Sequence, residues 1–251
     1  MKITFVHHSC FVVETDTKTL IFDYFPKGDM HGYVFTGELP EISADMPVYF
    51  FASHAHQDHF SLDILRLAGQ YTDVKYILSK DIRLSERYLE RNGIDPSIRQ
   101  KITFVAPCKH YEIDDMKIRT LRSTDAGVAY LVETDGKVIY HAGDLNLWKW
   151  DGAGELVNGR EARSYKHEIN KLRDVSIDVA FVPVDSRQKS YATEGLAYFM
   201  EQVDAKAIFP MHMWQEYDAV RAYKSKISNA DFARRLVEIT GENEEYELCE
   251  R

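Results

Sequence analysis

The sequence predicts one α/β domain over residues 1–251, a four-layer αββα sandwich built from two similar halves. Three observations support this prediction. Short strand-type runs rich in β-branched and aromatic residues recur along the chain, and segments with helical periodicity lie between them. No Pro/Gly/Ser-rich linker interrupts the sequence. A β-rich block followed by strand, helix and strand occurs twice, which indicates the two halves.

The first half is predicted from a β-meander followed by buried strands and outer helices. The run VYFFA at 48–52 is apolar throughout, as is typical of a strand buried on both faces. The strands expected here are residues 3–6, 10–14, 19–23, 48–52 and 74–78. The expected helices are residues 61–71, with Ser61 as N-cap, and 81–92, which stops at Gly93.

The second half repeats this order. Asp135-Gly136 lies between two strand-type runs and predicts a tight hairpin. Residues 145–163 are expected to be irregular, with a charged helix from there to about residue 173. The expected strands are residues 102–105, 117–121, 128–133, 137–141, 179–182 and 207–209, and the further helices are 193–203 and 217–227.

Composition restricts the classes of partner. The formal net charge is −9 and no Lys/Arg run is visible, so nucleic acid is a disfavoured partner. No stretch of about 20 apolar residues is present, so no membrane-spanning segment is expected. Three scattered cysteines, Cys10, Cys108 and Cys249, do not suggest a disulfide framework. Free thiols and the lack of a signal peptide predict a cytoplasmic protein.

The strongest chemical signal is the segment Ser53-His54-Ala55-His56-Gln57-Asp58-His59, directly after the apolar run 48–52. Three imidazoles and a carboxylate so close together suit a cation such as zinc. Residues two apart on an extended segment point the same way, so His54 and His56 can share one metal ion. A turn before the following helix can bring Asp58 and His59 to a second position. The alternative is a solvated histidine-rich loop.

Other candidate ligands also follow buried-type strands. Asp144 follows the run 138–140 and His212 follows 207–209. Because strand ends gather residues that are distant in sequence, both are predicted metal ligands. The alternatives are a turn or N-cap aspartate for Asp144 and a core histidine for His212.

These elements together resemble the metallo-β-lactamase superfamily, over nearly the whole chain. The histidine-rich segment is similar to the family's HxHxDH signature, and Ile21-Phe22-Asp23, Tyr140-His141-Ala142-Gly143-Asp144 and Pro210-Met211-His212 resemble further family elements in the expected order. His8-Ser9-Cys10-Phe11 and the Gly-Asp element Gly143-Asp144 together resemble the branch that contains the L-ascorbate-6-phosphate lactonases and many uncharacterised hydrolases.

The resemblance implies a role for each matching residue. One or two divalent ions are expected, zinc first, with manganese or iron as alternatives. Asp58 would also orient the nucleophile, Asp144 would bridge two ions, and Asp23 would orient a ligand histidine unless it is only a strand-end turn residue. His8 is expected at the mouth of the site in substrate binding or proton transfer. The implied metal ligands are His54, His56, Asp58, His59, Asp144 and His212.

One family feature is missing. The family carries a further histidine before the Gly-Asp element, but the matching residues 122–127 contain none. Thr124 stands at the expected spacing, with Asp125 beside it. Either Asp125 replaces the missing ligand, or water does, or the first site is weak or empty; Asp125 could equally be a turn residue. A more oxygen-rich site would favour manganese or iron.

Substrate-binding candidates are fewer. Trp148 follows Asp144 and would form an apolar wall or pack in the core. Asp185 and Arg187 follow the strand at 179–182, and the Arg187 guanidinium could hold an anionic group or pair with Asp185 on the surface. The remaining histidines considered, His7, His110 and His167, are expected at the surface or in turns.

These residues predict a metal-dependent hydrolase in which a metal-bound hydroxide attacks a small, potentially anionic metabolite at a lactone, ester or related bond. The alternatives are a phosphodiesterase or nuclease on the same fold and a non-catalytic metal-binding protein. A homo-oligomer is a further expectation.

Overall fold

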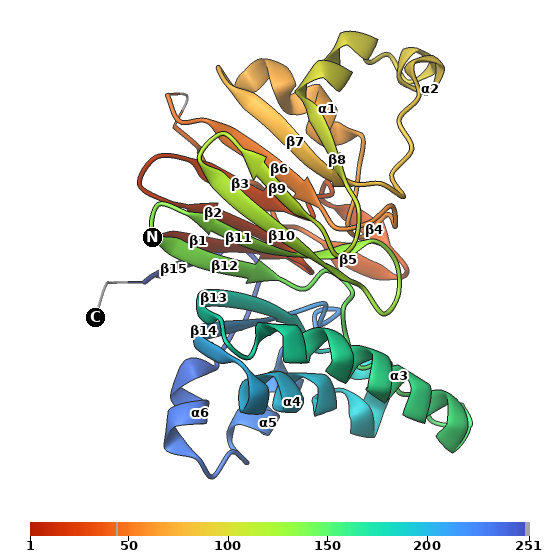
Figure 1. The fold of residues 1–251 in the computed structure, drawn as a ribbon, viewed down its shortest axis with the longest axis vertical. Helices are drawn as coiled ribbons and strands as arrows, with labels where there is room; N and C mark the ends of the chain where they lie inside the picture. The colour runs from red at the N-terminus through yellow and green to blue at the C-terminus, as the bar shows by residue number, and fades with distance from the viewer. Residues whose placement is uncertain (44, 249–251) are drawn as a thin grey trace. The chain divides into compact units, whose positions relative to one another are not determined.

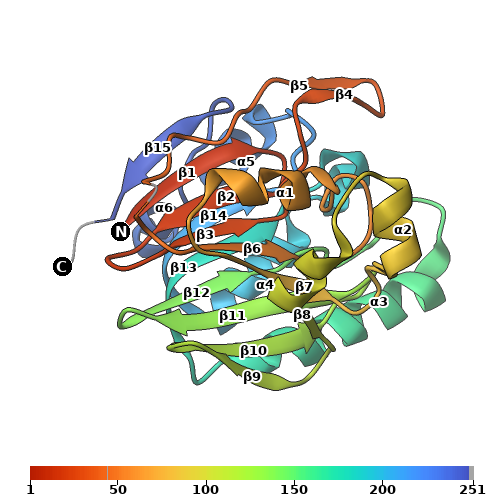
Figure 2. The ribbon, with the colours of Figure 1, turned by 90° about the horizontal axis from the view of Figure 1, so that it is seen from above.

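The computed structural model describes residues 1–43 and 45–248. They divide into two compact units, unit 1 (residues 1–43, 45–106 and 242–248) and unit 2 (Pro107–Gly241). Each unit is built on one large mixed sheet (Figures 1 and 2). The predicted α/β class with two similar halves is confirmed. The prediction of a single domain is not tested by this division and stays a prediction.

Unit 1 contains a seven-stranded sheet in the order β15-β1-β2-β3-β6-β7-β8. Its first strands form an antiparallel meander, and β3, β6, β7 and β8 are parallel. The strands are β1 (Lys2–His7), β2 (Cys10–Glu14), β3 (Thr19–Phe22), β6 (Val48–Ala52), β7 (Val74–Ser79), β8 (Ile102–Val105) and β15 (Glu244–Glu247). A separate hairpin is formed by β4 (Gly28–Met30) and β5 (Tyr33–Phe35).

The core of unit 1 explains why the run 48–52 is apolar at every position. Val48, Phe50 and Ala52 alternate along β6 and pack in one cluster with Ile64 of α1 and Leu89 of α2. The intervening residues of β6 are buried as well. The helices that cover this face are α1 (Asp63–Arg66) and α2 (Glu86–Arg91), with 3₁₀ segments at Leu67–Gln70 and Pro96–Lys101.

Unit 2 repeats the pattern with a six-stranded sheet in the order β14-β13-β12-β11-β10-β9. Strands β9 to β12 are antiparallel, and β12, β13 and β14 are parallel. The predicted hairpin turn is confirmed, with Asp135 and Gly136 both at positive φ. The strands are β9 (His110–Ile113), β10 (Met116–Arg122), β11 (Val128–Thr134), β12 (Lys137–His141), β13 (Ser176–Pro183) and β14 (Asp204–Met211).

Four helices accompany the sheet of unit 2. Figure 1 shows α3 and α4 side by side; α4 packs on β13 and α6 on β14. The helices are α3 (Gly154–Ile169), α4 (Glu194–Gln202), α5 (Asp218–Lys224) and α6 (Ala230–Arg235), with 3₁₀ segments at Asn170–Leu172 and Ser186–Tyr191. No helix in residues 1–43 and 45–248 is long and apolar enough to cross a membrane.

Several predicted helix boundaries are wrong. The stretch expected to be irregular to residue 163 becomes helical at Gly154, where no side chain caps α3 and two glycines weaken the helical signal. Helix α2 begins at Glu86 rather than at 81, because Ser85 caps it through the Tyr88 N–H. Ser61 is not the N-cap of α1, although its hydroxyl accepts from the Asp63 N–H.

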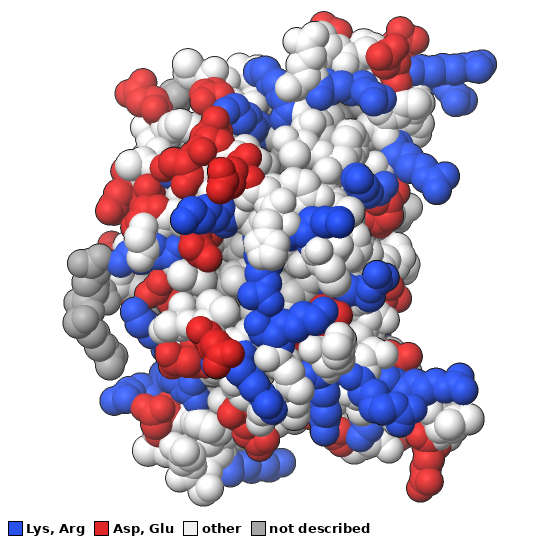
Figure 3. Space-filling view, in the orientation of Figure 1, with Lys and Arg blue, Asp and Glu red and all other residues white. Residues whose placement is uncertain are grey.

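Charges of both signs are mixed on the surface, and the two described cysteines are free. Lys and Arg side chains are mixed with Asp and Glu on the face drawn in Figure 3. Cys10 is buried and Cys108 is exposed, and both are free thiols. Cys249 lies outside the described residues.

Candidate metal and catalytic site

In unit 1 the histidine-rich segment begins where β6 ends. The His54 Nε2 and His56 Nδ1 atoms are 2.9 Å apart. Two imidazole lone pairs repel at this distance, so a proton or a cation must lie between the two nitrogens. His54 is fully buried while His56 is exposed, so one ring is fixed by its surroundings and the other faces solvent.

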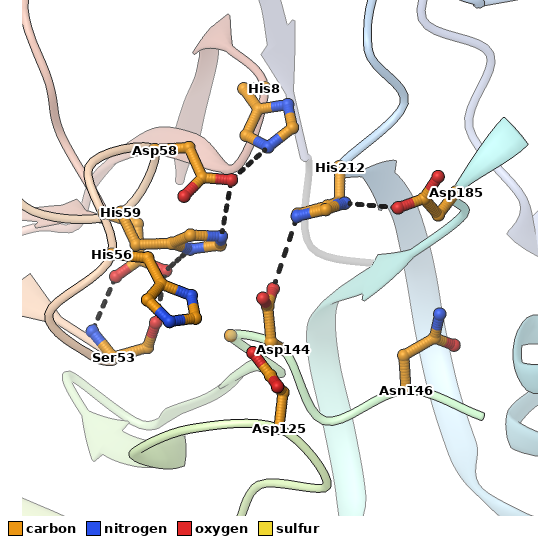
Figure 4. Close-up of polar contacts among 12 residues, drawn as sticks. His8, Ser53, His56, Asp58, His59, Asp125, Asp144, Asn146, Asp185 and His212 are labelled. Atoms are coloured by element: carbon orange, nitrogen blue, oxygen red, sulfur yellow. Dashed lines mark hydrogen bonds and ion pairs between the residues drawn. The ribbon is translucent and has the colours of Figure 1, made fainter. Parts of the chain in front are cut away.

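A second group of donors gathers around Asp58. Its Oδ2 atom lies 3.4 Å from His8 Nε2 and 3.7 Å from His59 Nε2, as the dashed lines in Figure 4 show. One ligand atom from each of these three residues lies within 4.8 Å of the others. The two imidazoles are buried and the carboxylate is half-buried. Two nitrogens and one carboxylate oxygen at this spacing fit a borderline divalent cation.

Asp23 contacts His59 directly and His54 through Ser53, and it determines which ring nitrogen of each histidine carries the proton. Its Oδ2 atom is 2.7 Å from both His59 Nδ1 and Ser53 Oγ, and Ser53 Oγ is 2.9 Å from His54 Nδ1. Because the Ser53 hydroxyl donates its one proton to Asp23, it accepts from the Nδ1–H of His54. Both rings therefore carry their proton on Nδ1 and leave Nε2 as an electron-pair donor. The carboxylate of Asp23 is fully buried, which strengthens this control.

Two backbone contacts hold the segment itself. The Ser53 N–H donates to Asp23 Oδ1 at 2.7 Å, and the Ala55 N–H donates to Asp81 Oδ2 at 2.9 Å. The sequence analysis included Ser53 in the histidine-rich segment and placed Asp81 at the start of a predicted helix, but it gave neither residue a supporting role. Ser53 adjoins the motif and was a detectable signal, whereas Asp81 gave none because it lies on the strand-following loop after β7.

In unit 2 the paired candidates are Asp144 and His212. Asp144 follows β12 through Gly143, whose φ of 51° provides the turn, and His212 follows β14. Asp144 Oδ1 lies 3.5 Å from His212 Nε2, and both residues are buried (Figure 4). An imidazole nitrogen and a carboxylate oxygen that converge in this way also fit a divalent cation.

The position of the missing histidine is occupied by a structural threonine. Thr124 Oγ1 donates to the Asn146 carbonyl oxygen at 2.6 Å and accepts from the Asn146 N–H at 3.1 Å. It also lies 3.4 Å from the Asp144 carbonyl oxygen. Asp125 is exposed, and one of its carboxylate oxygens lies within 4.8 Å of one of Asp144. Thr124 thus holds the loop that carries Asp144, and Asp125 places a carboxylate oxygen near that of Asp144.

Asn146 and Gln188 extend this network, and sequence reasoning missed both. The Asn146 amide donates to Gln188 Oε1 at 2.9 Å, and Gln188 Nε2 donates to the Leu147 carbonyl oxygen at 2.8 Å. Both side chains are buried. A polar residue two positions after Asp144 was a weak signal for Asn146, whereas Gln188 lies in a 3₁₀ segment with no sequence signature.

Asp185 and Arg187 form an ion pair, the alternative that the sequence left open, but the aspartate is not on the surface. Arg187 Nε lies 2.9 Å and 3.1 Å from the two Asp185 oxygens, and its guanidinium covers the Trp214 ring at 4.5 Å. The other partner of Asp185 is His212 Nδ1, at 3.2 Å. Burial alone would raise the pKa of Asp185, but hydrogen bonds from His212 and Arg187 outweigh it and lower the pKa to about 2.

Trp148 lies beside these residues and is half-buried. Its indole N–H donates to the Asp144 carbonyl oxygen at 3.0 Å, and its ring meets the His212 ring edge to face at 5.8 Å. Trp148 therefore serves the site partly as support for two ligand candidates.

Of the remaining histidines considered, two are exposed and one is buried. His110 and His167 are exposed, as predicted. The prediction for His7 is wrong, because His7 is fully buried at the end of β1 and its Nε2 bonds to the Phe25 carbonyl oxygen at 3.0 Å. Burial lowers the pKa of His7 to about 4, so it is neutral near pH 7.

Three candidate residues share a strained backbone. His8, Asp23 and His212 have φ values of 48°, 48° and 60°, each directly after a strand. Residues other than glycine pay about 1–3 kcal/mol for such conformations, which cluster at functional sites. At these three strand ends the strain falls on candidate site residues, and the same conformation also occurs at turns outside the site, such as Asp135.

The sequence of the chain is similar to known proteins. Residues 2–149, more than half of the chain, match the family model described as a beta-lactamase superfamily domain. A UPF0173 metal-dependent hydrolase from Bacillus velezensis is 27% identical over 223 residues, which cover 84% of this chain and 85% of that relative.

Two solved structures show a similar fold. A possible metal-dependent hydrolase from Veillonella parvula gives a TM-score of 0.62 at 12% identity and covers 99% of both chains. CmlA, a diiron β-hydroxylase from Streptomyces venezuelae, gives a TM-score of 0.54 at 13% identity, over 86% of this chain and 45% of that one. At these identities the likeness concerns the fold alone.

Proposed function

The chain belongs to the metallo-β-lactamase superfamily and is similar along most of its length to a named metal-dependent hydrolase, so it is a metal-dependent hydrolase. We propose that it cleaves a lactone, ester or related bond of a small molecule. The observation that carries the proposal is the convergence of ligand atoms in unit 1, where His54 Nε2 lies 2.9 Å from His56 Nδ1 and Asp58 Oδ2 lies 3.7 Å from His59 Nε2. The motif's likeness to the L-ascorbate-6-phosphate lactonase branch makes a lactone the first substrate to test.

We propose that the metal ligands are those the sequence predicts, namely His54, His56, Asp58, His59, Asp125, Asp144 and His212. The donor set supports one or two divalent ions. Imidazole nitrogens outnumber carboxylates, so zinc is the first candidate, and the aspartate in place of the missing histidine keeps manganese and iron as alternatives. A bound divalent ion lowers the pKa of a coordinated water and polarises the oxygen of the bond to be cleaved.

Side chains of the protein would transfer protons and hold the ligand histidines in position. Asp58 is only half-buried, so its carboxylate can accept a proton from the attacking water while it faces the imidazoles. His8 faces the same carboxylate at 3.4 Å and would pass a proton to or from it. Asp23 and Asp185 would not touch the substrate; each holds the Nδ1 atom of a ligand histidine. This role replaces substrate binding for Asp185, which has no exposed surface.

The test is metal content by elemental analysis of untagged protein, for the wild type, His56→Ala and Asp125→Ala, with exposed His167→Ala as the control. About two equivalents in the wild type, lost or halved in His56→Ala, support a binuclear site. A further loss in Asp125→Ala makes Asp125 a ligand. No metal above background after reconstitution contradicts the proposal. Turnover of a lactone, an ester and a phosphodiester by the same preparations then separates hydrolase, phosphodiesterase and non-catalytic metal binding.

A further inference from the structure

A cavity of about 600 Å³ opens in unit 2 where the chain enters α3. One wall is the first turns of α3, with Glu155, Asn158, Gly159 and Ala162 on one helical face. The cavity is also lined by Lys149, Trp150, Asp151 and Tyr191. A cavity of this volume is in the range of small-molecule sites.

An exposed tryptophan dominates this cavity. The Trp150 side chain is 38% exposed, although tryptophan is among the residues that proteins bury most. Asn158 holds its backbone on both sides, accepting from the Trp150 N–H at 3.0 Å and donating to its carbonyl oxygen at 3.1 Å. The backbone of Trp150 is thus held by Asn158 while part of its side chain stays open to solvent, an arrangement suited to stacking on a planar ligand.

A chain of aromatic ring contacts leads from Trp150, which lines the cavity, to His212. Trp150 stacks on Trp148 with centroids 6.1 Å apart and an interplanar angle of 3°. Trp148 in turn contacts His212 and donates to the Asp144 carbonyl oxygen. Two ring contacts, Trp150 to Trp148 and Trp148 to His212, therefore separate a ligand on Trp150 from His212.

The charges around the cavity determine what it prefers. Lys149 is the cation among the lining residues, and its ammonium is held by Glu194 at 2.6 Å and by the Tyr191 ring at 4.9 Å. Asp151 meets Lys189 at 3.8 Å. Among the described residues Glu155 has no ion-pair partner, so the charged lining residues Lys149, Asp151 and Glu155 carry one net negative charge; the Arg163 guanidinium beside Gly159 lies outside the lining. An anionic group would be repelled, whereas a neutral or cationic group would not.

We propose that this cavity is a substrate subsite that takes a planar group without negative charge, stacked on Trp150. The proposal deepens the proposed function, on which it rests, by naming the chemistry of the substrate part away from the cleaved bond. It also agrees with Arg187, whose charge is already satisfied by Asp185 and is a poor anchor for an anion.

The test uses three probes of nearly equal shape, the neutral benzamide, the cationic benzamidinium and the anionic benzoate, titrated against the full-length chain by ligand-observed NMR. Benzamide and benzamidinium are expected to bind with dissociation constants of about 1 mM, and benzoate at least about threefold more weakly. Trp150→Ala should weaken benzamide about tenfold, and Trp150→Phe should retain most of the affinity.

A second variant fills the cavity without touching the tryptophan. A Cβ atom at Gly159 would meet Arg163 Nη1 at 3.6 Å, an ordinary contact, so Gly159→Leu is compatible with the fold and should abolish probe binding. Equal affinity for benzoate, no binding of any probe, or binding that survives both Trp150→Ala and Gly159→Leu would overturn the subsite. Titrations with and without a chelator separate this result from metal binding, because failure of the metal site leaves stacking on Trp150 unchanged.

Discussion

The Asp23 carboxylate holds His59 Nδ1 at 2.7 Å and reaches His54 through the hydroxyl of Ser53. One buried carboxylate therefore sets the tautomer of two candidate metal ligands. Asp23→Asn replaces one oxygen by a donor that cannot accept from either Ser53 or His59. We expect metal affinity to fall about 10–100-fold, measured by competition with a chromogenic chelator. The exposed Asp29→Asn is the matched control, and unchanged affinity in Asp23→Asn would remove the orienting role.

Thr124 offers a test of the loop that carries Asp144. Thr124→Val keeps the shape but removes the hydroxyl that both donates to and accepts from Asn146. We expect a stability loss of about 1–3 kcal/mol by thermal unfolding. Metal binding should also weaken, because the Asp144 loop loses its anchor. Thr124→Ser should restore both properties, and a serine variant as poor as the valine variant would show that the hydroxyl is not the reason.

The role of Arg187 can be determined by comparing a neutral with an anionic substrate. If its main role is to hold Asp185, then Arg187→Ala lowers turnover of neutral and anionic substrates alike and leaves the ratio of their KM values unchanged. If it binds an anion, KM rises for the anionic substrate only. We expect the first result, with a stability loss of about 1–2 kcal/mol, since the guanidinium is half exposed while Asp185 is buried. Steady-state kinetics on a charged and uncharged ester pair decide this.

The sequence was informative where chemistry is concentrated in a short segment. His54 to His59 follow an apolar strand, so both the strand and the cluster were predictable from adjacent residues. The mixed class and the doubled order of elements followed from strand-type runs and one clear Asp-Gly turn. The edge strand β15 has three acidic residues and no apolar alternation, so its pairing with β1 depends on a tertiary contact that local pattern does not encode.

The supporting residues of the site were harder to predict, for the same reason. Asp81 and Gln188 act through hydrogen bonds to backbone groups far away in sequence, and an aspartate or glutamine on a loop is ordinary in any protein. His7 was misassigned because it precedes His8 in a short connection that resembles a turn, yet the fold covers it completely. Which polar residues become buried depends on packing that the local sequence does not specify.

His7 leads to a prediction about pH. Its pKa is lowered to about 4 in the folded state, against an ordinary value of 6.5, because burial disfavours the charged ring. His7 is therefore protonated below about pH 6.5 in the unfolded chain, but only below about pH 4 in the folded chain. Stability from this residue is complete above pH 6.5, falls as pH decreases toward 4, and is constant below that. The total loss is about 3 kcal/mol.

The measurement is urea unfolding of the wild type and His7→Gln from pH 7.5 down to pH 4, since glutamine can donate to the Phe25 carbonyl oxygen but does not titrate. The difference in unfolding free energy between the two proteins should favour the wild type most at high pH and shift by about 3 kcal/mol toward the variant at low pH. Other titrating groups cancel in this difference. The exposed His167→Gln should show no such shift, and a pH-independent difference for His7→Gln would mean that the pKa of His7 is the same in the folded and the unfolded chain.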